Sequence, residues 1–157
     1  MSTTEGIPSQ ATPRPATEPM GPVATDTPAL GRDVVSVRLP ATAAYLAVLR
    51  TTTASLAARL DFTLDEIEDL RIAVDEACCL LLADAAPEAE LTSVFEMSED
   101  VIHINVSTRT TRGRGPARDS FAWTVLSALA GEVDSWTEPD GQQTIALVKH
   151  RDREVSA

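Results

Sequence analysis

The spacing of apolar residues predicts five strands in this chain. Short β-rich runs, in which apolar and polar residues alternate between turn residues, are typical of strands with one buried face. Runs of this kind occupy residues 34–39, 91–97, 101–107, 133–137 and 143–149. In the third run, Ile102, Ile104 and Val106 point to one face, and His103 and Asn105 point to the other.

Apolar residues spaced three and four apart predict three helices. The expected helices cover residues 42–60, 63–86 and 120–130. The second opens with a capping box, in which Thr63 and Glu66 each satisfy a free backbone N–H group of the first turn. The third is capped by Asp119 or Ser120 and ends at Gly131, a residue suited to the position after a helix.

The order of these elements is β-α-α-β-β-α-β-β, which predicts one α+β domain over residues 34–150. Neighbouring strands favour a two-layer sandwich, with the helices covering one face of a mixed or antiparallel sheet. Residues 1–33 contain six of the ten prolines and almost no large apolar side chains. We therefore expect a disordered N-terminal tail, and a second short tail over 151–157.

The formal net charge of −11 affects the choice of partner. A charge of this sign disfavours nucleic acids and anionic membranes, whose phosphates it repels, and it suits a basic protein partner. No run approaches the roughly 20 apolar residues that span a bilayer, and the N-terminus lacks the pattern of a signal peptide. Cys78 and Cys79 are adjacent, which is unsuited to a disulfide framework. A cytoplasmic protein is expected.

The second predicted helix carries a candidate catalytic residue, Glu76. Its apolar stripe, which should pack on the sheet, comprises Ile67, Leu70, Val74, Ala77, Cys78 and Leu81. Glu76 lies nearly opposite this stripe, so it is either an ordinary exposed glutamate or a functional carboxylate. Residues 77–83 are apolar on all sides, so Glu76 stands where a polar half meets a half that should be covered. A carboxylate at such a boundary is a candidate general base.

A basic loop is predicted between residues 108 and 118. It contains Arg109, Arg112, Arg114 and Arg118, with Gly113 and Gly115 between them. Three interpretations remain open: a solvated lid, a site for nucleotide phosphates, for which arginine is well suited, and a contact with a protein partner.

The run 71–78, Arg-Ile-Ala-Val-Asp-Glu-Ala-Cys, preceded by Asp69-Leu70, resembles the N-box helix of the RsbW-type anti-sigma regulatory factors. The resemblance extends from about residue 34 to 150. It includes the opening strand, the first helix with Leu49-Arg50, and the closing strand 141–149. These proteins are serine/threonine-protein kinase-like members of the superfamily that contains the histidine-kinase and gyrase ATPase domains.

The resemblance implies a Bergerat-type, histidine-kinase-like fold with about three helices on a mixed five-stranded sheet. It also implies a protein that binds ATP and Mg²⁺, sequesters an alternative sigma factor and is released by an anti-anti-sigma factor. Many members phosphorylate a serine or threonine of that antagonist. Homodimers are expected as well.

At the family's functional positions in the second helix, this sequence has one matching residue and one that differs. Glu76 stands at the position of the family's catalytic carboxylate. Leu80 stands where the family has the asparagine that holds Mg²⁺, and a leucine has no atom that can ligate a metal. No metal ligand is therefore predicted here.

The other nucleotide-binding motifs also depart from the family pattern. Gly113 and Gly115, flanked by Arg112 and Arg114, are candidate nucleotide-binding residues in the position of the family's spaced glycines. Thr111, or Thr108 in an alignment by strand register, replaces the aspartate that binds the adenine amino group. The run 119–123 contains no glycine that could form a phosphate loop. The resemblance thus indicates a degenerate ATP site.

The family pattern further indicates a partner-binding surface on the first helix, with Tyr45, Arg50 and Arg59 as candidate residues. The resulting hypothesis is an anti-sigma factor that regulates transcription negatively. Two alternatives remain: an active ATP-dependent serine/threonine kinase that uses Glu76 as its base, and a redox-gated binding module that uses Cys78 and Cys79.

Overall fold

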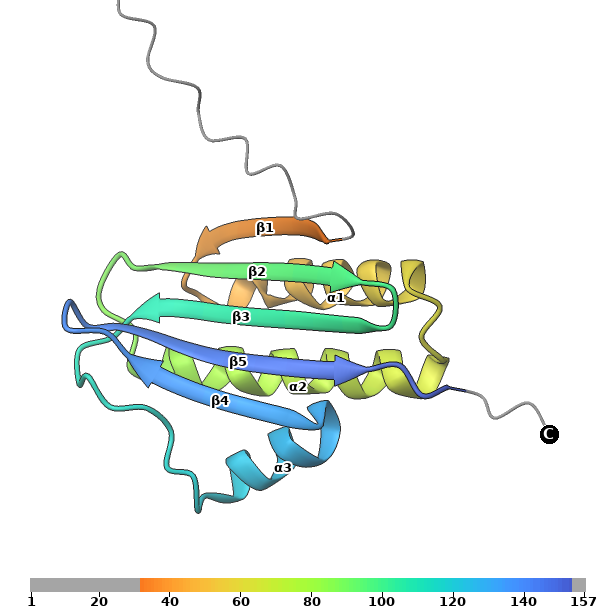
Figure 1. The fold of residues 1–157 in the computed structure, drawn as a ribbon. Helices are drawn as coiled ribbons and strands as arrows, with labels where there is room; N and C mark the ends of the chain where they lie inside the picture. Colours follow the sequence, from red (N-terminus) through yellow and green to blue (C-terminus); the bar gives the residue numbers. More distant parts are fainter. Residues whose placement is uncertain (1–31, 154–157) are drawn as a thin grey trace, which may run out of the picture.

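The computed structural model describes residues 32–153 (Figure 1). Residues 1–31 of the expected N-terminal tail and residues 154–157 of the expected C-terminal tail lie outside the described residues. The helices and strands are β1 (Asp33–Pro40), the 3-10 turn η1 (Ala43–Tyr45), α1 (Leu46–Arg59), α2 (Leu64–Ala83), β2 (Glu90–Ser98), β3 (Val101–Arg109), α3 (Phe121–Ala130), β4 (Glu132–Thr137) and β5 (Gln142–His150). The predicted order of elements is confirmed.

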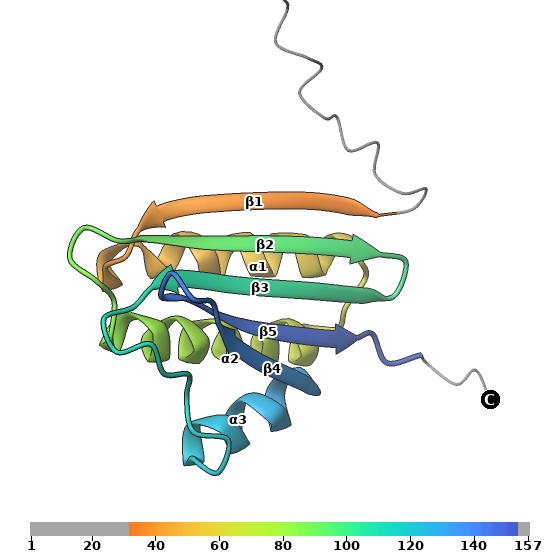
Figure 2. The same ribbon diagram turned by 60° about the vertical axis from the view of Figure 1, so that its left-hand side comes forward.

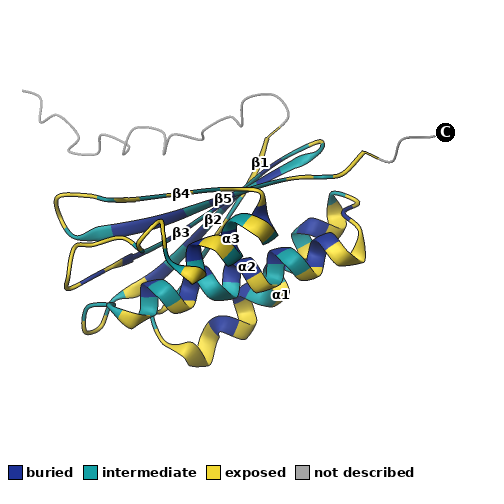
Figure 3. Cartoon of the chain, turned by 90° about the horizontal axis from the view of Figure 1, so that it is seen from below, coloured by how far each residue is buried: buried dark blue, intermediate teal, exposed yellow. Residues whose placement is uncertain are grey.

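The five strands form one sheet in the order β1-β2-β3-β5-β4. All four pairings are antiparallel. The mixed sheet that the family resemblance implied is therefore not found. The three helices lie on one face of the sheet, as predicted, with α2 between α1 and α3 (Figure 3). Figure 2 shows α3 at the β4 end of the sheet. The expected α+β two-layer sandwich is therefore confirmed.

The alternation of side chains in the central strands explains the two layers. Residues of β2 and β3 alternate between buried and partly exposed along almost their whole length. The buried faces of β3 and β5 pack against α2, whose predicted apolar stripe is buried throughout. The fully buried large side chains of this core include Phe95, Ile104, Leu147, Leu70, Val74 and Leu81.

Two helix ends differ from the prediction because backbone groups find other partners. The first helix begins at Leu46, since residues 43–45 form a 3-10 turn. The second ends at Ala83 instead of Ala86. The N–H group of Ala86 donates a hydrogen bond to the carbonyl of Arg109 (2.8 Å), so it pairs with the end of β3 and does not continue the helix.

The third helix has the expected termini. Ser120, one of the two cap candidates, accepts a hydrogen bond from the N–H group of Trp123 (3.2 Å). Gly131 follows the helix with a φ of +92°, a conformation that glycine adopts without steric cost. Among the described residues, no helix combines the length and apolar character needed to cross a membrane.

Glu66 joins the start of α2 to the end of the chain. Its Oε2 accepts a hydrogen bond from the N–H of Thr63 (2.7 Å), and the Thr63 hydroxyl accepts one from the N–H of Glu66 (3.2 Å). Oε1 of Glu66 accepts a third, from the N–H of Asp152 (2.7 Å). The predicted capping box is therefore confirmed. Residues 151 and 152, which follow the expected boundary at residue 150, therefore contact the domain through their backbone N–H groups.

The charge of Glu66 is maintained in spite of burial. Glu66 is only 5% exposed, and burial by itself raises the pKa of a carboxyl group. The hydrogen bonds from Asp152 and Thr63 outweigh this effect and hold the pKa of Glu66 below its ordinary value of 4.5. Folding therefore favours the charged form.

We expect Glu66→Gln to lower the free energy of unfolding at neutral pH by about 1–3 kcal/mol, because bonds to a charged acceptor are weakened. The contribution of the charge is complete above the ordinary glutamate pKa. It is lost as the pH falls through the lower pKa of the folded state. Urea unfolding of both proteins from pH 7 to pH 3 measures this. A stability difference that stays constant over this range would contradict the assignment.

Candidate functional site

Glu76 and Leu80 lie one turn apart on α2. Glu76 is partly buried, as its position at the polar boundary predicted, whereas Cys79 and Ala83 are exposed, so the helix is not covered on every side. Leu80 packs against the hydrophobic core. At about 100° per residue, Leu80 lies about 140° around the helix from Asp75, which faces α1. Leu80 therefore belongs to the side of α2 that is remote from α1.

The first part of the basic loop is fixed to the C-terminal end of α2. The N–H of Thr111 donates to the carbonyl of Asp84 (2.9 Å), and the Arg112 guanidinium pairs with the Asp84 carboxylate (3.2 Å). Asp84 follows Glu76 by eight residues, or about 12 Å along a helix axis. The sequence did not indicate Asp84, because only the folded chain brings it to residue 112.

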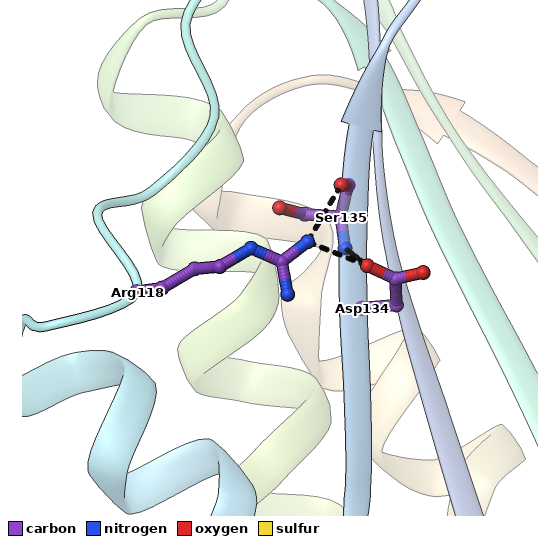
Figure 4. A network of polar contacts seen from close by, with 3 residues as sticks. All are labelled: Arg118, Asp134 and Ser135. Carbon is purple, nitrogen blue, oxygen red and sulfur yellow. Dashed lines mark hydrogen bonds and ion pairs between the residues drawn. The ribbon is translucent and has the colours of Figure 1, made fainter.

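The second part of the loop is fixed to β4 (Figure 4). Arg118 donates from Nη2 to Oδ1 of Asp134 (2.6 Å) and to the carbonyl of Ser135 (3.3 Å). Its guanidinium also lies 4.7 Å from the centre of the Trp123 ring, a cation–π contact. The bonds from Arg118 and from the N–H of Ser135 hold the pKa of Asp134 below its ordinary value.

The two candidate glycines differ in their surroundings. Gly113 has a φ of +60° and open space around its missing Cβ. A Cβ on Gly115 would lie 3.2 Å from Nε2 of Gln143 and 3.3 Å from Oγ of Ser135. The close approach at Gly115 therefore brings the loop to the β4–β5 hairpin. Packing alone accounts for this glycine, without a phosphate.

Neither of the two threonines that could stand at the adenine-binding position makes the contacts expected of an aspartate that binds adenine. Thr108 is buried, and its hydroxyl donates to the carbonyl of Glu90 (2.8 Å). The hydroxyl of Thr111 donates to the carbonyl of Asp84 (3.4 Å). Both groups are therefore used inside the domain. A carboxylate that could accept a hydrogen bond from adenine is absent from both positions.

These residues do not fit Mg·ATP. Leu80 places apolar carbon where the metal ligand should be, and the threonines cannot replace the acceptor of the adenine amino group. Within residues 32–153, no cluster of three or more His, Cys, Asp or Glu side chains is arranged to hold a metal ion. The loop arginines that could contact phosphate are divided: Arg112 and Arg118 are paired with carboxylates, while Arg109 and Arg114 make no ion pair within the described range.

The three candidate partner-binding residues lie on η1, which contains Tyr45, and on α1, which contains Arg50 and Arg59. Arg50 donates from Nη1 to Oδ1 of Asp75 on α2 (3.1 Å), and both side chains remain partly exposed. Tyr45 and Arg59 are exposed, and Arg59 lines a cleft with β1. The structure thus does not bring these three residues together. The Arg50–Asp75 pair could not be foreseen, because the two residues are 25 positions apart.

Cys78 and Cys79 point in different directions. Cys78 is buried, and burial together with the nearby Asp75 raises its pKa to about 12. Cys79 is exposed, yet burial of part of its surroundings and the carboxylates of Asp75 and Glu76 raise its pKa as well. Because the thiolate is the reactive form, the raised pKa lowers the reactivity of both thiols.

Two known proteins that are similar in sequence to this chain are both RsbW proteins. The chain is 34% identical over 123 residues to the anti-sigma-F factor RsbW of Mycobacterium tuberculosis, which covers 76% of this chain and 72% of that protein. It is 40% identical over 75 residues to the serine-protein kinase RsbW of Bacillus cereus, covering 46% of this chain and 47% of the kinase. No protein-family model matches the chain.

The fold is similar to that in a crystal structure of the RsbU and RsbW domains of a Mycobacterium tuberculosis protein. The TM-score is 0.61 at 15% sequence identity, and the match covers 77% of this chain and 33% of the other. The similarity at this level of identity concerns the fold.

We expect one thiol of the native protein to react with a disulfide reagent at pH 7, and to react more slowly than free cysteine because the pKa of Cys79 is raised. Cys78 should react only after unfolding. Counting the modified thiols by mass spectrometry, with Cys79→Ser as the control, measures this. Rapid reaction of both thiols in the folded protein would restore the redox interpretation.

Proposed function

Because this chain belongs to the RsbW family of anti-sigma factors, we propose that it binds an alternative sigma factor and keeps it from RNA polymerase. An anti-anti-sigma factor releases the sigma factor again. The observation that carries the proposal is the match to the anti-sigma-F factor RsbW, which extends over three quarters of the chain. The two-layer fold agrees with it.

The surface that we assign to the sigma factor comprises the exposed side of α2 and the Arg50 flank of α1. From residue 61 to 100 the chain has 13 acidic residues and one basic residue, Arg71. Asp65 and Glu68 are exposed on α2, and Glu76 is partly exposed. Such a surface attracts a basic partner and accelerates association more than it increases affinity.

ATP has at most a weak role in this proposal. In phosphoryl transfer, Mg²⁺ neutralises the negative charge of the phosphates. Leu80 has no atom that could ligate this metal ion. Losing one hydrogen bond to a buried group costs about 1–3 kcal/mol, and here the metal ligand and the adenine acceptor are both replaced. Binding of the sigma factor should therefore not require nucleotide.

An active protein kinase is the second candidate function. The name of the Bacillus cereus relative, a serine-protein kinase, and the presence of Glu76 favour it. Two features argue against it: the apolar surroundings of Leu80, and the hydrogen bond that the Thr108 hydroxyl donates to the carbonyl of Glu90. A redox-gated module is disfavoured by the raised pKa of both thiols.

We also propose a cytoplasmic location and a homodimer. RNA polymerase and sigma factors work in the cytoplasm, where adjacent cysteines such as Cys78 and Cys79 stay reduced. The dimer follows the family pattern.

We expect the full chain to recover a sigma factor and an anti-anti-sigma factor from the cells that produce it. Affinity capture followed by mass spectrometry is the measurement. Recovery of neither class of protein, from cells in which both are detected, would refute the proposal.

With the captured sigma factor purified, we expect Glu76→Lys to slow association several-fold, because it removes attraction to a basic surface. The effect should shrink as salt is added. Glu138→Lys changes the net charge equally on the β4–β5 turn and is the matched control. Stopped-flow measurement of the association rate of both variants tests this. Equal slowing by Glu138→Lys would argue against α2 as the docking surface.

We expect Mg²⁺ to leave the affinity for ATP unchanged, because Leu80 cannot ligate it. Isothermal titration with ATP, with and without Mg²⁺, measures this. Tighter binding with Mg²⁺, together with phosphate transfer to the anti-anti-sigma factor that Glu76→Gln abolishes, would establish the kinase alternative instead.

A further inference from the structure

No helix or strand within residues 32–153 covers the face of the sheet that is turned away from the helices. Figure 1 views the sheet from this uncovered face, with the helices behind it. Its central part is formed by outward side chains of β2 and β3, all partly exposed, among them Thr92, Val94, Asn105 and Ser107. The uncovered face thus offers hydroxyl and amide groups beside small apolar groups.

Trp136 adds an aromatic surface to the uncovered face. Val133, three positions earlier in β4, packs against the core, so Trp136 points to the opposite face, where it is 42% exposed. Thr144 lies directly opposite Trp136 in β5 and is only 5% exposed, although it belongs to the uncovered face. Its hydroxyl shares a hydrogen bond with that of Ser107 (3.0 Å). Trp136 accounts for the burial of Thr144, and the outer side of its indole remains accessible.

The chain enters β1 with a side chain anchored on the same face. Val34 points outward at the start of β1, opposite Glu96 of β2. Arg32, two residues earlier, continues this alternation, and its guanidinium lies 3.7 Å from the Glu96 carboxylate. The chain that precedes Arg32 is therefore connected to one corner of the uncovered face.

The segment that precedes Arg32 is rich in proline. Residues 1–31 contain six of the ten prolines, and Pro19-Met20-Gly21-Pro22 has the P-x-x-P spacing. In the polyproline II conformation, which proline favours and which has three residues per turn, residues with this spacing share one side. This conformation has no internal hydrogen bonds, so its carbonyls need other donors, and aromatic rings bind its prolines. The uncovered face provides both, through its hydroxyl and amide side chains and Trp136.

The connection is long enough to bring this motif to Trp136. Ten residues separate Pro22 from Arg32, which corresponds to about 31 Å in an extended proline-rich chain. Four strand spacings, or about 19 Å, separate β1 from β4. The strand registers place Trp136 four residues from Glu96 along the strands, or about 13 Å. The straight path is therefore about 23 Å, which is within reach.

Charge favours the uncovered face over the helices as a surface for this segment. Residues 1–31 carry three acidic residues and one basic residue, so the acidic exposed side of α2 repels them. On the uncovered face, Arg38 pairs with Glu90 (3.5 Å), and Arg109 in the same cleft makes no ion pair within the described residues. The uncovered face therefore repels an acidic segment less than α2 does.

We propose that the proline-rich segment of this chain binds across the uncovered face of its own sheet, from Arg32 toward Trp136. Pro19 and Pro22 contact the outer side of the indole, and polar side chains of β2 and β3 donate hydrogen bonds to carbonyls of the segment. Each contact is weak, but a short linker holds the motif at an effective concentration on the order of millimolar. The helices stay free for a protein partner, so the proposal is independent of sigma-factor binding.

Quenching of tryptophan fluorescence by acrylamide tests the proposal in the full chain. Trp123, the only other tryptophan, is 9% exposed, so the quenchable emission comes mainly from Trp136. Replacing both prolines of the motif, Pro19→Ala with Pro22→Ala, should raise the quenching constant about twofold, because the outer side of the indole is released to solvent.

Pro8→Ala with Pro13→Ala is the matched control and should leave the quenching constant unchanged. Because the contact lies within one chain, quenching of the natural sequence should also stay constant over a wide range of protein concentrations. Equal quenching constants for the natural sequence and the variant of the P-x-x-P motif would overturn the proposal. Quenching that increases on dilution would also overturn it, because Trp136 would then be covered by the segment of another copy.

Discussion

The packing of α2 on three sides is the constraint on which the rest of the domain depends. Its apolar stripe is buried against the sheet, α1 packs on one flank and α3 on the other (Figure 3). Aliphatic side chains supply most of the contacts, since aromatic residues are few. The same requirement for apolar contact affects the candidate nucleotide site, because Leu80 packs against the core in the position where a metal ligand would have to be polar.

The basic loop shows how a segment can be ordered by the protein itself. Asp84 holds its beginning, Asp134 holds its end, and Gly115 lets its middle approach the β4–β5 hairpin. Arginine suits both tasks, because its guanidinium binds carboxylates and also stacks on the ring of Trp123. A phosphate would have to compete with these carboxylates for Arg112 and Arg118. The loop is therefore better suited to shaping the surface between α2 and β4 than to holding a nucleotide.

The distribution of charge divides the molecule into surfaces with different uses. Acidic residues are concentrated on α2 and the strands that follow it, and the β4 edge is acidic as well. The β1 edge is the exception, because Arg38 pairs with Glu90 and the preceding Arg32 pairs with Glu96.

The sequence by itself determined the order of the elements, the capping box at Thr63 and Glu66, the glycine that follows the third helix, and the buried stripe of α2. These features depend on hydrogen bonds and periodicities within a few residues, so local sequence is sufficient. It also indicated the family, through the run 71–78. Only the tertiary structure decided that every strand pairing is antiparallel, that Ala86 pairs with β3, and that Glu66 holds Asp152. It likewise separated Arg50 from Tyr45 and Arg59 and brought Asp84 and Asp134 to the loop. Each of these contacts joins residues far apart in the chain, and their geometry is fixed by how the layers pack.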